Sequence, residues 1–73
     1  MDAMKTGTLI ARTRKEKGLT QRELAEKVYV SVQAVSKWER GESEPSTSNL
    51  LALAKLFGVS PAQLLESAAP PEG

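Results

Sequence analysis

The chain has 73 residues, no cysteine, no histidine and a formal net charge of +1 at pH 7. This length allows one domain, and the composition excludes a disulfide and the usual zinc or iron site. No stretch approaches the roughly 20 apolar residues that span a bilayer, and the first residues lack the pattern of a signal peptide. We therefore expect a small cytoplasmic protein without a metal or other cofactor, whose modest core gains support from a partner chain.

Apolar residues recur at helical spacing along the chain, and glycine or proline separates the periodic segments. This pattern predicts an all-α fold, a compact bundle of five short helices. The first helix is expected from about Thr8 to Lys17 and is ended by Gly18. Its inward-facing candidates are Leu9, Ile10 and Thr13.

The second and third helices are predicted from their starting residues. Thr20-Gln21-Arg22-Glu23 has the form of a capping box, in which a threonine and a glutamate satisfy early backbone amides. After a tight connection at Tyr29-Val30, Ser31 is expected to cap a third helix that reaches Glu39 or Arg40. Gly41 ends that helix.

The last two helices follow a polar loop. Ser46 is expected to cap an apolar fourth helix, and Ser60-Pro61-Ala62-Gln63 combines an N-cap, a proline at the first helical position and a second capping box. The resulting domain covers residues 8–67, between a lead-in at 1–7 and a disordered tail at 68–73.

The third helix has two chemically different faces. The connection of about three residues is too short for antiparallel packing, so the second and third helices must cross steeply, as in a helix-turn-helix. One stripe of the third helix is apolar and is expected in the core, an interpretation that we favour over base stacking by its tryptophan; it consists of Ala34, Val35 and Trp38. The other face can read base edges in the major groove of double-stranded DNA; it consists of Val32, Gln33, Ser36, Lys37 and Arg40.

Three ordered strings resemble the XRE family of helix-turn-helix regulators, the phage Cro and CI repressor type. They are Leu19-Thr20-Gln21-Arg22-Glu23-Leu24-Ala25, Val30-Ser31-Val32-Gln33-Ala34-Val35-Ser36-Lys37-Trp38-Glu39-Arg40-Gly41 and Leu53-Ala54-Lys55-Leu56-Phe57-Gly58-Val59-Ser60. The resemblance implies that the bases are contacted by Val32, Gln33, Ser36 and Lys37. It implies phosphate contacts for Gln21, Ser31 and Arg40, and a structural ion pair between Arg14 and Glu39.

Two positions depart from the family pattern. Tyr29 stands where the family often has a turn glycine, and we therefore expect a positive φ at this tyrosine. Glu42 and Glu44 occupy a loop that tends to be basic in phage repressors, which predicts weaker phosphate binding there.

These observations predict a transcriptional regulator, a repressor, that binds an inverted repeat as a homodimer and is nucleoid-associated in a bacterium or derived from a phage. The expected dimer surface is apolar and lies around the last helix, with core closure as the other interpretation; it consists of Val59, Leu64 and Leu65, joined by Leu56 or Phe57. The alternative function is an antitoxin or regulatory protein-interaction module with secondary DNA binding. An enzyme is not expected, because the usual nucleophile, base and phosphate-binding loop are missing.

Overall fold

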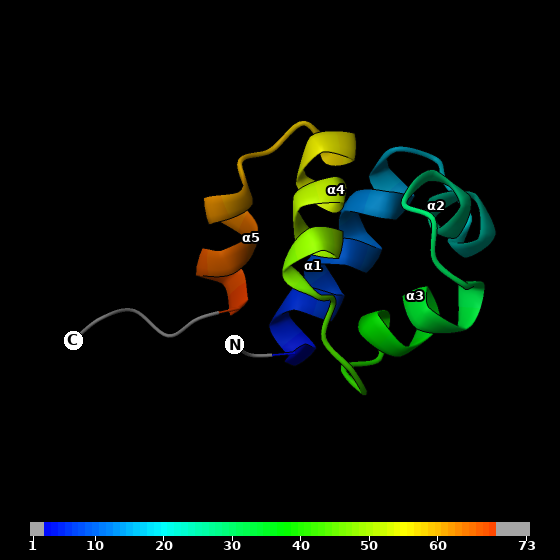
Figure 1. Cartoon of the computed structure of the whole chain (residues 1–73), viewed down its shortest axis with the longest axis horizontal. Coiled ribbons are helices and arrows are strands. Elements are labelled where there is room, and N and C mark those ends of the chain that lie inside the picture. Colours follow the sequence, from blue (N-terminus) through cyan, green and yellow to red (C-terminus); the bar gives the residue numbers. More distant parts are fainter. Residues whose placement is uncertain (1–2, 69–73) are drawn as a thin grey trace.

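The computed structural model describes the backbone of residues 3–68 and the side chains of residues 4–64, and five α-helices make up this part of the chain (Figure 1). Their bounds are α1 Ala3–Glu16, α2 Gln21–Lys27, α3 Val32–Glu39, α4 Thr47–Phe57 and α5 Pro61–Ala68. The predicted all-α bundle is therefore confirmed. Helix α1 packs against both α3 and α5, so it joins the two halves of the bundle.

The core receives at least one fully buried side chain from every helix. These side chains are Ile10, Leu24, Val35, Leu53 and Leu64. The predicted apolar stripe of α3 points into this core, because Val35 and Trp38 are both buried and Ala34 packs against them from a partly buried position. The core assignment of Trp38 is therefore confirmed, and the opposite face of α3 remains open to other partners.

Polar N-caps start four of the helices at the predicted residues. Ser31 Oγ accepts from the Ala34 backbone N–H at 3.1 Å, and Ser46 caps α4 in the same way. Two reciprocal capping boxes form as predicted; their members are Thr20 with Glu23 and Ser60 with Gln63. The backbone N–H of Thr20 donates to the Glu23 carboxylate, which lowers the pKa of this carboxyl below its ordinary value of 4.5.

The start of α1 differs from the prediction. The helix begins at Ala3 instead of Thr8, so residues 3–7 of the expected lead-in are helical. Glycine is a poor helix former, but Gly7 is buried against α3, where an added Cβ would overlap the Trp38 carbonyl oxygen. Close approach of the two helices therefore outweighs the low helix propensity of glycine. At the other end α5 includes Ala68, and the rest of the predicted tail lies outside the described residues.

The predicted dimer surface is partly wrong. Leu64 is only 1% exposed and fills the core beneath α5, and Phe57 is buried as well. Val59 and Leu56 keep partial exposure, whereas the side chain of Leu65 lies outside the described residues. The sequence showed that these positions are apolar but could not divide them between the interior and the surface.

Candidate nucleic-acid interface

Helices α2 and α3 form the helix-turn-helix of this chain. Residues 28–31 connect them, and Figure 1 shows the two helices crossing instead of running side by side. The turn depends on Tyr29, whose φ is 59° and whose side chain is 93% exposed. The predicted positive φ is confirmed. Beyond it, the Val30 backbone N–H donates to the Ala25 carbonyl at 3.0 Å and directs the chain into α3.

The four expected base-contact residues share one side of α3. Their spacing along the helix places them together, opposite Val35 and Trp38; they are Val32, Gln33, Ser36 and Lys37. Gln33 and Lys37 are exposed, and the other two are partly buried. This surface offers an amide, an ammonium group, a hydroxyl and methyl groups, which are the groups that recognise base edges.

The three expected phosphate-contact residues lie at helix ends around this surface. Gln21 is the first residue of α2, Ser31 is the N-cap of α3, and Arg40 is the C-cap of α3. The Ser31 oxygen accepts from Ala34, which leaves its O–H group as a donor. All three side chains therefore present donors, as a phosphate oxygen requires.

Arg14 and Glu39 form a nearly buried ion pair that joins α1 to the end of α3. Arg14 Nε donates to Glu39 Oε2 at 2.6 Å and Nη2 donates to Oε1 at 3.1 Å; the side chains are 11% and 8% exposed. Arg14 Nη1 also donates to the Leu19 carbonyl at 2.8 Å. The carboxylate therefore binds the guanidinium through both oxygens, the geometry that makes such pairs strongest.

Gln21 is a third member of this network, and sequence reasoning missed this contact. Its Nε2 donates to Glu39 Oε1 at 2.9 Å, which fixes the amide beside the end of α3. One proton of the amide remains for another acceptor. No local pattern in the sequence could have indicated the contact, because it depends on how the first turn of α2 lies against α3.

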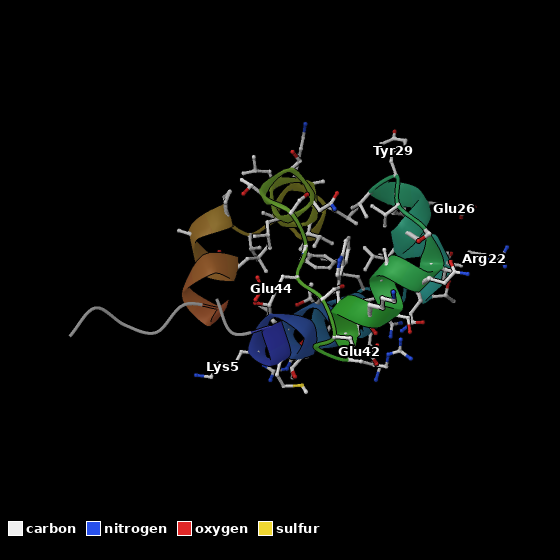
Figure 2. All side chains as sticks on the ribbon, turned by 60° about the horizontal axis from the view of Figure 1, so that its bottom comes forward. Lys5, Arg22, Glu26, Tyr29, Glu42 and Glu44 are labelled. Atoms are coloured by element: carbon white, nitrogen blue, oxygen red, sulfur yellow. The ribbon has the colours of Figure 1, made fainter. Side chains whose placement is uncertain are left out.

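The charge around the surface is mixed. Arg40 pairs with Glu42, with Nε 3.0 Å from Oε2, and both side chains are more than half exposed. Figure 2 shows Glu42 beside the end of α3 and Glu44 on the part of the loop towards α5. Residues 4–64 contain no group of three or more acidic side chains suited to hold a metal ion, and none of the described helices has the length and apolar character needed to cross a membrane.

The Helix-turn-helix family model matches residues 10–64 of the chain. The chain belongs to this family, in its XRE type. It is similar to the HTH-type transcriptional regulator DicA of Escherichia coli K12, with 46% identity over 59 residues that cover 81% of the chain and 44% of DicA. It is also 42% identical to repressor protein C2 of Salmonella phage P22 over 66 residues, which cover 90% of this chain and 31% of the phage protein. The chain thus spans less than half of these two relatives.

The solved structures of a repressor and of a gene regulator share its fold. The P22 c2 repressor, determined in complex with a synthetic operator, superposes with a TM-score of 0.80 at 44% identity, covering 85% of this chain and 94% of that one. The clp gene regulator ClgR of Corynebacterium glutamicum gives a TM-score of 0.82 at 35% identity, with 93% of this chain and 72% of that one covered. The helix-turn-helix assignment made from the sequence is confirmed.

Proposed function

We propose that this XRE-type domain regulates transcription, as a repressor, by reading a defined sequence of double-stranded DNA with the outer face of α3. The observation that carries the proposal is that four side chains with groups suited to contact base edges lie together on one open face of α3, the second helix of the helix-turn-helix. The P22 c2 repressor, which has the same fold, was solved bound to an operator. The proposal assigns no catalytic role to any residue.

In this proposal α3 enters the major groove with its outer face, from Val32 to Lys37, towards the bases. Gln33 hydrogen-bonds to a base edge, Lys37 donates to a second base, and Val32 contacts a thymine methyl group. Ser31 binds a phosphate near the start of α3, and Gln21 and Arg40 bind phosphates near its end. Contacts at both ends would fix the register of the helix in the groove.

We further propose that two copies bind one inverted repeat. A single recognition helix contacts only a few base pairs, so one small domain discriminates weakly among genomic sites. Val59 and Leu56 are the partly exposed apolar residues next to α5 that such a contact could use. A dimer of this kind acts on the nucleoid, in the cytoplasm of a bacterium.

Selection from a pool of randomised duplexes tests the proposal. We expect enrichment of an inverted repeat whose half-sites lie roughly one helical turn apart, and two protein chains bound per selected duplex. A selected site that binds one chain, without inverted symmetry, would exclude the dimer. If no duplex is enriched, DNA reading is excluded, and the protein-interaction alternative would be tested next.

A further inference from the structure

Arg40 lies on the same face of α3 as the expected base-contact residues, and its side chain forms an ion pair with Glu42. It follows Lys37 by three residues and Ser36 by four, so the three side chains lie on one side of the helix. Its Nε lies 3.0 Å from Glu42 Oε2, and its Nη2 lies 3.4 Å from Glu42 Oε1. Two of its donor nitrogens therefore face a carboxylate of the same chain.

The backbone brings Glu42 to this position. At the end of α3 the Gly41 N–H donates to the Trp38 carbonyl at 3.1 Å, and the Glu42 N–H donates to the Lys37 carbonyl at 2.9 Å. These two bonds form a Schellman motif, which requires the positive φ of 74° at Gly41. The motif turns the chain back, so that residue 42 returns beside the C-cap arginine.

Stability of the fold does not explain this pair. The Arg40 and Glu42 side chains are 57% and 54% exposed, and ion pairs in that environment contribute little to folding. A DNA phosphate, however, needs the same guanidinium donors that the Glu42 carboxylate uses. Glu42 and a phosphate therefore compete for Arg40.

We infer that Glu42 lowers the affinity of the domain for DNA by competing with a phosphate for Arg40, so that the Arg40–phosphate contact forms at the expense of the Arg40–Glu42 pair; Glu42 is therefore an affinity-setting residue. The inference rests on the proposed function, because it needs a duplex bound against α3. Of the two acidic residues in this loop, Glu42 and Glu44, only Glu42 is expected to lower the affinity in this way. Glu44 carries the same charge on the same loop, but among the described side chains it forms no ion pair with Arg40.

The test compares Glu42→Gln with Glu44→Gln, which removes the same charge two residues away. Binding is measured by fluorescence anisotropy on the duplex selected by the wild-type protein, at about 0.15 M salt. Glu42→Gln should bind about two- to fivefold more tightly than the wild type, and Glu44→Gln should gain clearly less. In an Arg40→Ala background, the two glutamine substitutions should have the same small effect.

The salt dependence gives a second readout. If the Arg40–phosphate contact becomes stronger in Glu42→Gln, the slope of log K against log salt should become steeper by up to about 0.9. An unchanged slope, or a gain from Glu42→Gln that persists in the Arg40→Ala background, would overturn the inference. Failure of the wild type to select any duplex would overturn the proposed function as well, whereas selection without tighter binding by Glu42→Gln overturns the inference alone.

Discussion

Arg14 and Glu39, which are far apart in the sequence, lie together with Nε 2.6 Å from Oε2, and they connect α1 to the end of α3. Their carboxylate also accepts from Gln21, so one nearly buried charge positions three helices. Burial makes each partner dependent on the other, because a charge left alone there keeps its desolvation cost without compensation. The exposed pair of Arg40 and Glu42 lacks this dependence.

Removing either member of the buried pair should therefore destabilise the fold. We expect Arg14→Ala and Glu39→Ala each to lower the free energy of unfolding by about 2–4 kcal/mol, measured by urea denaturation. The double variant should lose clearly less than the sum, because the second substitution removes a charge that already lacks its partner. The same cycle on Arg40 and Glu42 is the control, with changes below about 1 kcal/mol. Additive losses at Arg14 and Glu39 would contradict this account.

Gly7→Ala tests the close packing of α1 on α3. Helix propensity alone predicts that alanine stabilises this position by about 1 kcal/mol. The structure predicts the opposite sign, because the new Cβ would overlap the Trp38 carbonyl oxygen and lie 3.1 Å from the Glu39 backbone. We expect a loss of about 1–3 kcal/mol in thermal unfolding. Thr8→Ala, at the next and exposed position of α1, should stabilise the protein slightly, by up to about 0.7 kcal/mol, because only helix propensity changes there. A more stable Gly7→Ala protein would rule out the contact.

Tyr29→Gly should stabilise the protein. The tyrosine backbone has φ of 59°, which costs an L-residue about 1–2 kcal/mol, and its exposed side chain contributes no core packing. Glycine adopts this conformation freely, although its greater freedom in the unfolded chain offsets part of the gain. We expect a net increase of about 1 kcal/mol, read as a higher Tm. Tyr29→Ala keeps the strained backbone and should show no such increase; an equal gain in both variants would disprove strain as the cause.

Glu23 should make part of the stability depend on pH. Its pKa in the folded protein lies below the ordinary value of 4.5, mainly because the Thr20 backbone N–H donates to it. A lowered folded pKa stabilises the protein above the unfolded value, and this contribution is lost as the pH falls through the folded pKa. Glu23→Gln keeps a neutral capping box, so its Tm should fall less steeply than that of the wild type between about pH 5 and about pH 3.

The capping box of α5 provides the opposite test, in which a charge is added to a neutral box. Ser60 and Gln63 form the same reciprocal bonds without a charge. Gln63→Glu should therefore add acid sensitivity where the wild type has none from this box. Parallel pH profiles for all three proteins would show that the boxes do not contribute to acid stability.

Local chemistry allowed much of the fold to be predicted from the sequence. Thr20, Ser31, Ser46 and Ser60 act as N-caps because their hydroxyls satisfy nearby backbone amides, and this depends only on adjacent residues. The missed features depend on tertiary distance. Gly7 is helical because α3 approaches it, and Leu64 is buried because α5 folds back over the core. The spacing of apolar residues along the sequence predicts neither the close approach of α3 to Gly7 nor the burial of Leu64.

The same distinction applies to the candidate site. Helical period placed Gln33 and Lys37 on one face of α3, and the structure agrees with that placement. The bond from Gln21 to Glu39 and the pairing of Arg40 with Glu42 required coordinates, since they depend on helix crossing and on the turn at Gly41. The sequence therefore indicated which side chains could contact DNA. The structure showed which of these side chains already bind other residues of the chain.

Gln33→Ala and Lys37→Ala test whether the open face of α3 reads bases. Both side chains are exposed and neither belongs to the core, so we expect each variant to keep the Tm of the wild type. Each should weaken binding to the selected duplex by about 1–3 kcal/mol and relax the preference at one base position, because a lost base contact affects only the matching sequence.

Two substitutions distinguish base recognition by α3 from the nonspecific attraction of a positive charge to DNA. Arg40→Ala, at an expected phosphate contact, should weaken binding to all duplexes about equally. Lys55→Ala removes the same charge as Lys37→Ala from an exposed position on α4 and should leave the base preference intact. Repeating the selection with each variant measures the preference directly. If Lys37→Ala lowers affinity equally for selected and random duplexes, as loss of a nonspecific charge would, then Lys37 does not contact a base.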